Sequence, residues 1–129
     1  MTCGGPAGLS AALILGRCCR KVALIDAGHP RNAASGGMHG YLSRDGTPPG
    51  EFLQTNREQL QKYPGVECFS GTATNCQRLE DGFEVHSGEG GLFRSKLLLL
   101  ATGLVDPLPP VEGVEAFYGK TIHHSNKSN

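Results

Sequence analysis

The chain has 129 residues, enough for one ordinary domain. Its 12 basic and 12 acidic residues give a formal net charge of zero, so the sequence carries no electrostatic footprint for nucleic acid or for an anionic membrane surface. Its 19 glycines, without tryptophan and without a collagen-like period, favour a loop-rich α/β chain whose backbone approaches a ligand closely.

The cysteines indicate a reducing compartment. There are five of them, an odd number, and none forms a C-x-x-C pair, so a disulfide framework is not expected. The vicinal pair Cys18-Cys19 is interpreted as packing residues. The apolar run 7–16 lacks the flanks of a secretory signal and is too short to span a bilayer. These features predict a cytoplasmic protein.

The first 27 residues organise the rest of the chain. A glycine-rich turn, residues 4–8, precedes an apolar helix pattern over Leu9–Arg17, and a short strand pattern, Lys21–Ile25, ends on Asp26. This order is that of the second half of a nucleotide-binding βαβ unit. Asp26 follows Gly8 at close to the spacing of about 20 residues expected of an acid that accepts hydrogen bonds from ribose hydroxyls.

Two glycines of the turn, Gly5 and Gly8, are needed for separate physical reasons. Gly5 has no Cβ, so backbone amides can approach a pyrophosphate, and Gly8 lets the helix lie close to the sheet. The pattern also departs from the usual fingerprint, because Cys3 stands where the first glycine is expected. Only Met1 and Thr2 precede it, so the first strand of the fold is predicted to be missing.

A long irregular stretch, residues 27–49, follows the acid. Structureless loops of this length inside compact domains are usually functional. A surface excursion is the alternative. The stretch contains several side chains that can make polar contacts with a ligand: Arg31, Asn32, Ser35, His39, Tyr41, Arg44 and Asp45.

The middle of the chain predicts a helix and then short strands. The helix covers Phe52–Lys62 and is ended by proline and glycine. The strand Val66–Phe69 follows and is continued, after a break, by Gly71–Thr74. Alternating residues in Phe83–Ser87, then a glycine-rich turn into Leu92–Ser95, complete a small antiparallel meander.

The apolar run Lys96–Ala101 predicts a fully buried parallel strand that ends at Thr102-Gly103. The carboxyl end of such a strand is where ligands meet a doubly wound sheet. The proline-rich residues 106–113 predict an extended crossing. Residues 1–122 are therefore interpreted as one partial domain, and residues 123–129 as a disordered polar tail.

In this order the motifs resemble the flavin-binding domain of thioredoxin-reductase-like pyridine nucleotide–disulfide oxidoreductases, a group that includes dithiol oxidases. The resemblance implies an α/β, Rossmann-like FAD-binding domain with a central parallel sheet and a small antiparallel meander, incomplete at its first strand and its C-terminal return segment. The motifs that carry the resemblance are Gly4–Ala12, Leu24-Ile25-Asp26, Pro30-Arg31-Asn32, Met38-His39-Gly40, Arg44-Asp45-Gly46, Leu100–Gly103 and Tyr118-Gly119-Lys120.

The resemblance also implies a cofactor, FAD, with NAD(P)H as the reductant of the parent family. By analogy Gly5 and Gly8 face the pyrophosphate, Asp26 the adenosine ribose, and Arg31 and Asn32 the phosphates or the flavin side, while Thr72-Ala73 presents backbone to adenine. The residues expected at the cofactor are Gly4, Gly5, Pro6, Ala7, Gly8, Asp26, Ala27, Arg31, Asn32, His39, Thr72, Ala73, Ala101, Thr102 and Gly103.

The chain departs from that family at its C-terminal end. Ser125 follows His123-His124 where the family has the first cysteine of its redox-active Cys-x-x-Cys, and a serine hydroxyl cannot replace a thiolate in disulfide exchange. The NADPH domain is also missing. The sequence therefore predicts a truncated piece of such an enzyme, without catalytic residues of its own and without a metal site.

Two further functions remain open: a non-catalytic nucleotide-binding remnant, and a Rossmann protein that binds NAD at the same motif. The expected partner is a small dinucleotide, not nucleic acid or a membrane. Members of the family are commonly homodimers.

Overall fold

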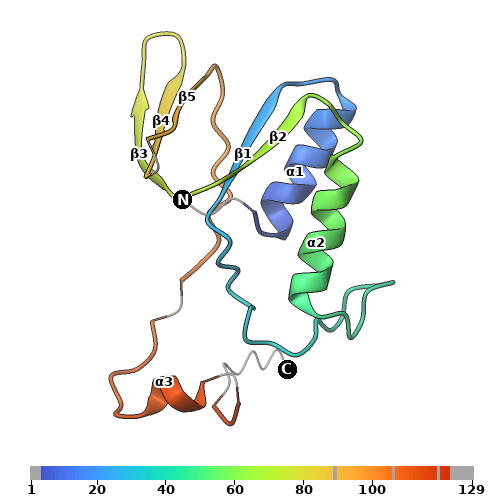
Figure 1. Cartoon of the computed structure of the whole chain (residues 1–129), viewed down its shortest axis with the longest axis vertical. Coiled ribbons are helices and arrows are strands. Elements are labelled where there is room, and N and C mark those ends of the chain that lie inside the picture. The colour runs from blue at the N-terminus through green and yellow to red at the C-terminus, as the bar shows by residue number, and fades with distance from the viewer. Residues whose placement is uncertain (1–3, 89, 106, 119, 123–129) are drawn as a thin grey trace.

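In the computed structural model, the residues described are 4–88, 90–105, 107–118 and 120–122. The elements follow the order α1 (Pro6–Arg17), β1 (Val22–Asp26), α2 (Pro49–Leu60), β2 (Val66–Ser70), β3 (Ala73–Arg78), β4 (Phe83–Ser87), β5 (Leu92–Ser95) and α3 (Val114–Phe117) (Figure 1). The predicted polar tail, residues 123–129, lies outside the described residues. Among the helices of the described part, none is long and apolar enough to cross a membrane.

Helix α1 begins earlier than the predicted start at Leu9. Gly5 is its extended N-cap (φ −74°, ψ 177°), and Pro6 takes the first helical position, which the fixed φ of proline suits. Leu9 is buried on the inner face. Gly16 lies on that face too, where a Cβ would come within 2.8 Å of Val66 Cγ2. This glycine therefore sets how closely α1 approaches β2.

Helix α2 packs beside α1 and completes the core. It begins at Pro49, and the Glu51 carboxylate lies in its first turn, where the helix dipole favours negative charge. The core consists of buried apolar side chains from α1, β1 and α2: Leu9, Ala12, Leu24, Phe52, Leu53 and Leu60. Burying a large apolar side chain is worth about 1.5–3 kcal/mol, so this cluster is the main source of stability in the described structure.

Strands β1 and β2 form a parallel pair joined by α2. Their register runs from Val22 opposite Val66 to Asp26 opposite Ser70, so both strands end at the same edge. In α/β sheets, ligands bind at the carboxyl ends of the strands. The parallel register thus places Asp26 at the edge of the sheet where a ligand is expected.

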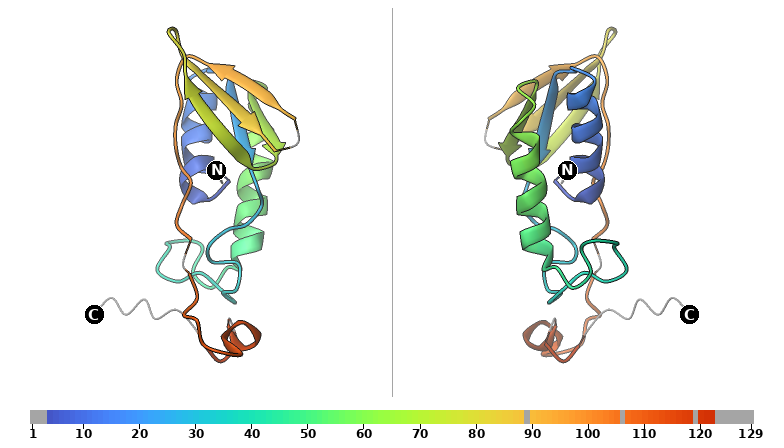
Figure 2. Two further views of the ribbon diagram at one scale, coloured as in Figure 1. Left: turned by 90° about the vertical axis from the view of Figure 1, so that its left-hand side faces the viewer. Right: turned by 90° about the vertical axis from the view of Figure 1, so that its right-hand side faces the viewer.

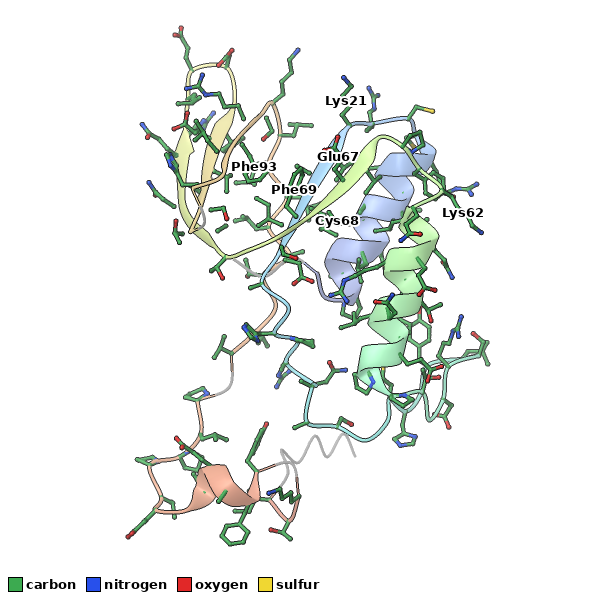
Figure 3. The ribbon with its side chains drawn as sticks, viewed as in Figure 1. Lys21, Lys62, Glu67, Cys68, Phe69 and Phe93 are labelled. Carbon is green, nitrogen blue, oxygen red and sulfur yellow. The ribbon has the colours of Figure 1, made fainter. Side chains whose placement is uncertain are left out.

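The sheet lies between two covering layers. Figure 2 shows α1 and α2 on one face of β1 and β2 and the meander on the other. Phe69 on β2 and Phe93 on β5 face each other across this second boundary (Figure 3), with ring centroids 4.9 Å apart and planes inclined by 65°. The aromatic pair therefore joins the meander to the parallel sheet.

The predicted antiparallel meander is confirmed, with strand order β3-β4-β5. Its first strand is longer than expected: Gly71–Thr74 was predicted as an interrupted continuation of the preceding strand, whereas β3 extends to Arg78 in a separate sheet. Gly71 explains the break, because its φ of +147° is a conformation that side-chain-bearing residues rarely adopt. Val85 on β4, the central strand of the meander, is buried.

The prediction of a buried parallel strand over Lys96–Ala101 is wrong. These residues belong to no strand, and Leu97 is 86% exposed, with Leu99 and Leu100 more than half exposed. A buried strand needs a hydrogen-bonded neighbour and cover on both faces. Within the described ranges β1 pairs with β2 alone, and the segment after β5 runs past α1 on the side of β1 away from β2 (Figure 2). The apolar run therefore has the composition of a strand but not its pairing.

The short helix α3 was not predicted. Residues 107–113 are irregular, as a proline-rich segment should be, and Gly113 then caps the helix in a left-handed conformation (φ +80°). Val114 is buried at its first position. Four helical residues complete barely one turn, which is too short for a periodic pattern to reveal.

Candidate functional site

The candidate site lies at the carboxyl edge of β1, where the turn before α1 meets Asp26. Gly4 is buried there, and a Cβ at this position would overlap the Asp26 carboxyl group. The sequence pattern assigned Gly5 a close approach to a pyrophosphate, and that assignment remains a prediction. A Cβ at Gly5 would meet no protein atom within 4 Å. The Asp26 contact therefore requires glycine at Gly4, whereas the space beside Gly5 is open.

The N-terminus of α1 offers backbone donors beside this turn. The first N–H groups of a helix have no partner within it, and Pro6 has none to give, so the donors come from Ala7 and the buried Gly8. In the described structure no side chain caps this end, and no acidic residue stands in the first turn. Together with the positive end of the helix dipole, these amides suit a phosphate.

Asp26 is held by donors from two other parts of the chain. The Gly28 N–H donates to Oδ1 at 3.0 Å, and Arg57 Nη2 on α2 donates to Oδ2 at 2.6 Å. The Asp26 side chain is only 15% exposed and that of Arg57 35%. Partial burial by itself raises the pKa of Asp26, but the hydrogen bonds from Gly28 and Arg57, the charge of Arg57 and a bond from Gly4 lower the pKa below its ordinary value. The carboxyl group is therefore ionised at neutral pH.

Cys68 on β2 is close enough to this ion pair to sense both charges. Burial raises the pKa of the Cys68 thiol, the Arg57 guanidinium lowers it and the Asp26 carboxylate raises it, with a net rise. The thiol therefore stays protonated at neutral pH and carries no charge that competes for Arg57.

Ala27, another residue expected at the cofactor, follows Asp26 in the chain and is half-buried.

Thr72 and Ala73 lie near the same edge. The Gly71 N–H donates to the Asp26 carbonyl oxygen at 3.0 Å, which extends the β1–β2 ladder by one bond past the strands. Thr72 follows, and its carbonyl accepts the Gly88 N–H at 3.0 Å. That Thr72-Ala73 presents its backbone to adenine remains a prediction.

Arg31 and Asn32 are exposed in a turn of the loop that follows β1. That turn is closed by backbone bonds from Ala33 N–H to the Pro30 carbonyl and from Ser35 N–H to the Asn32 carbonyl. A ligand role for Arg31 and Asn32 remains a prediction.

His39 belongs to a second, well-closed part of the loop. Backbone bonds between Met38 and Thr47 (2.9 Å) and between Gly46 and Met38 (2.7 Å) tie its two ends together. His39 Nδ1 lies 3.5 Å from Asp45 Oδ1, and its side chain is 78% exposed. The structure thus places His39 against Asp45 on the surface of the loop.

Ala101, Thr102 and Gly103 were expected beside the cofactor because they would end a buried strand. That strand is not formed, so this reason no longer holds. Ala101 and Thr102 are half-buried, and Gly103 is exposed in a left-handed conformation (φ +68°).

Arg57 is the residue that the sequence pattern missed. It lies 31 residues from Asp26, and no motif joins the two. A signal was present nonetheless, because Arg57 falls four residues after Leu53 and three before Leu60, within the buried stripe of α2. A charged residue at such a position needs a partner.

Comparison with known proteins agrees with this arrangement. The model of the family described as pyridine nucleotide-disulphide oxidoreductase matches residues 4–129. A probable thioredoxin reductase of Arthroderma benhamiae is 34% identical over 126 residues, covering 93% of this chain and 31% of that protein. Thioredoxin reductase tcpT of Claviceps purpurea is 35% identical over 124 residues, covering 94% of this chain and 39% of the relative.

Solved structures agree as well. A putative thioredoxin reductase, TrxB, of Bacillus anthracis superposes with a TM-score of 0.88 at 33% identity, covering 93% of this chain and 41% of the other. An oxidoreductase from Agrobacterium tumefaciens gives the same TM-score at 36% identity, covering 95% and 41%.

The chain thus spans roughly a third to two fifths of the length of these proteins. The expected Rossmann-like α/β fold and the resemblance are confirmed. The chain belongs to the pyridine nucleotide-disulphide oxidoreductase family, within its thioredoxin-reductase-like group.

Proposed function

We propose that this chain binds FAD at the carboxyl edge of β1, as the flavin-binding part of an NAD(P)H-dependent disulfide reductase or dithiol oxidase. One observation carries the proposal: the backbone of Gly4, the uncapped start of α1 and the ionised carboxyl group of Asp26 meet at the end of a parallel strand pair. Family membership supports a flavin dinucleotide at this place. The reaction of the whole protein is part of the proposal.

The residues at this edge fit the adenosine half of the cofactor. The amides of Ala7 and Gly8 suit the negative pyrophosphate. The open space beside Gly5 allows the cofactor to approach the backbone. Asp26, held ionised by Gly28 and Arg57, can accept hydrogen bonds from ribose hydroxyls.

FAD, when bound, supplies the hydride and electron transfer, and the protein supplies binding, orientation and electrostatics. The part assigned to this chain is to hold the phosphates and the ribose. A dithiol and a nicotinamide site belong to the proposed parent reaction.

A second candidate is nucleotide binding without turnover. It is favoured by Ser125, which stands where the family has the first cysteine of its reactive pair. An NAD-binding role at the same edge is also chemically compatible with Asp26. Comparing the affinities of the chain for NAD and for FAD distinguishes this role from the first proposal.

The test is the visible absorption spectrum of the purified chain after addition of FAD and desalting. We expect a retained flavin band in the unmodified chain. Gly5→Val fills the space through which the cofactor approaches, and Asp26→Asn removes the charge, so both should lose the band. Asp81→Asn is the matched control, since Asp81 is an exposed carboxylate in the turn between β3 and β4 and should not alter retention.

Titrations with NAD and with FAD distinguish the candidates. Tighter binding of NAD than of FAD, with the same sensitivity to Asp26→Asn, would favour the NAD role. No measurable binding of either dinucleotide would overturn the proposal.

A further inference from the structure

The ion pair between Asp26 and Arg57 joins the proposed ribose acid on β1 to helix α2. The Arg57 Nη2–Asp26 Oδ2 distance is 2.6 Å, and both side chains are partly buried, with Asp26 at 15% exposure. Arg57 stands within the apolar stripe of α2, between Leu53 and Leu60. Placing a guanidinium there costs desolvation energy, which its carboxylate partner offsets.

The donors around Asp26 leave part of its acceptor capacity unused. A carboxylate has two oxygens with about four lone-pair directions. Gly28 N–H takes one on Oδ1, Arg57 one on Oδ2, and the Gly4 backbone makes a further bond. These three bonds leave at least one lone pair of the carboxylate for a ligand, and the space beside the neighbouring Gly5 is open.

We propose that Arg57 is a positioning residue for the nucleotide: it fixes the Asp26 carboxylate in the orientation in which its remaining lone pairs accept the ribose hydroxyls. This inference rests on the proposed FAD site. Arg57 needs no contact with the cofactor, since it acts through Asp26. A freely rotating carboxylate would lose conformational entropy when the nucleotide binds. A carboxylate that is already fixed by Arg57 does not pay that cost.

Among the residues that the structure describes, groups from several elements act on the Asp26 carboxyl group. They are the Arg57 guanidinium on α2, the Cys68 thiol on β2, and the backbone N–H groups of Gly28 and Gly4. Of these Arg57 alone carries a charge at neutral pH, because the thiol is protonated. Removing Arg57 should therefore make Asp26 easier to protonate, and FAD affinity should fall at a higher pH on acidification.

The experiment measures FAD affinity by fluorescence quenching between pH 4 and pH 8 for the full chain and for Arg57→Met. Hydrogen bonds to charged groups have strengths that correspond to about a tenfold change in affinity or more. We expect Arg57→Met to bind FAD about tenfold more weakly at pH 7. The acid limb of its affinity profile, the pH range in which acidification weakens FAD binding, should move to higher pH. Arg57→Lys, which keeps the charge, should restore the limb to near its original position.

Two controls separate positioning from a merely structural role. Arg94→Met removes another arginine–carboxylate contact, between Arg94 Nε and Glu84 Oε2 at 2.8 Å on the meander, and should leave FAD affinity and its pH profile unchanged. In the Asp26→Asn background, Arg57→Met should cause no additional loss of affinity. NMR of the ligand-free proteins can follow the chemical shift of the Asp26 carboxyl carbon as a function of pH. The pKa of Asp26 read from this shift should be higher in Arg57→Met.

The outcomes are distinct. A full chain that binds no FAD overturns the proposed function, and with it the ribose role of Arg57. A full chain that binds FAD, with an Arg57→Met variant of the same affinity and the same acid limb, overturns this inference alone. An equal loss from Arg57→Met with and without Asp26→Asn also overturns it, because Arg57 would then act independently of Asp26.

Discussion

The α/β half of the chain, residues 4–26 and 49–70, and the segment 96–105 both contain dense apolar stretches, but their side chains have different environments. In the α/β half, Leu53 and Leu60 are 4% and 2% exposed. In the later segment Leu97 is 86% and Leu104 67% exposed. The later segment is the more apolar of the two, with seven apolar residues in ten, so hydrophobic composition cannot explain why its side chains are exposed.

The difference lies in the partners available to each backbone. Strand β1 has β2 on one edge and helices α1 and α2 over one face, so that edge of its backbone is paired and the side chains on that face are covered. The segment 96–101 has no strand neighbour within the described residues. An apolar run becomes a core element only where hydrogen-bond partners and covering side chains are both present.

The sharpest way to test this comparison is a pair of leucine truncations. Leu60→Ala should lower the free energy of unfolding by about 2–5 kcal/mol, because it leaves a cavity between α1 and α2. Leu97→Ala should change it by no more than about 0.5 kcal/mol, as at other exposed positions. Urea unfolding followed by circular dichroism measures both. A comparable loss from Leu97→Ala would show that the later segment is packed in solution.

The second prediction concerns neighbouring glycines of the turn. Gly4→Ala forces the Asp26 carboxyl group away from Gly28 and Arg57, so we expect a loss of about 1–3 kcal/mol. Gly5→Ala meets open space at an ordinary φ of −74°, so its effect on unfolding should stay within about 0.5 kcal/mol. Thermal unfolding of the two variants without ligand measures the difference. Equal melting temperatures would contradict the close contact between Gly4 and Asp26.

The third prediction compares two helical glycines. Alanine is intrinsically better than glycine in a helix by about 0.5–1 kcal/mol. Gly50 has open space around it, so Gly50→Ala on α2 should be stabilising. At Gly16 the new methyl group would lie 2.8 Å from Val66 Cγ2 and 3.0 Å from Tyr63 Cβ. Gly16→Ala should therefore be destabilising by about 1 kcal/mol, within the overpacking range; a stabilising effect would show that α1 can move away from β2.

The same contrast explains how much the sequence could predict. Helices α1 and α2, strand β1 and the meander carry local signals: proline at the helix starts, glycine at the turns, and alternation in Phe83–Ser87. Such signals depend on nearby residues, so they survive in the fold. The predicted strand over 96–101 depended on a neighbour elsewhere in the chain, and a hydrophobic pattern does not specify one.

The candidate site divides in the same way. The glycine-rich segment, the helix that follows it and Asp26 were predicted, because their spacing along the chain is part of the motif, although α1 begins at Pro6 rather than at Leu9. Arg57 was missed because its contact with Asp26 depends on how α2 crosses from β1 to β2. The steric need for glycine at Gly4 was not predicted, because the Asp26 side chain that excludes a Cβ there belongs to another element. The approach of Gly5 to a pyrophosphate stays a prediction.

The smallest expected effect is the pH dependence of stability that comes from Asp26. Its pKa is lower in the folded chain than in the unfolded one, so the unfolded state binds more protons as the solution is acidified. The contribution to stability is therefore complete above the unfolded pKa of about 3.9 and is lost as the pH falls through the folded pKa. Because Arg57 is 35% exposed and solvent screens the pair, we expect about 1 kcal/mol or less.

Asp26→Asn removes this titration, so it should reduce the difference in unfolding free energy between pH 7 and pH 3. The measurement is urea unfolding at both pH values for the two proteins. A variant that keeps the full difference would show that Asp26 is solvated in the free chain, and that the α/β half holds its carboxylate no more firmly than an exposed loop does. A reduced difference would mean that the acid is already prepared before any ligand binds, because its donors belong to the packed half of the molecule.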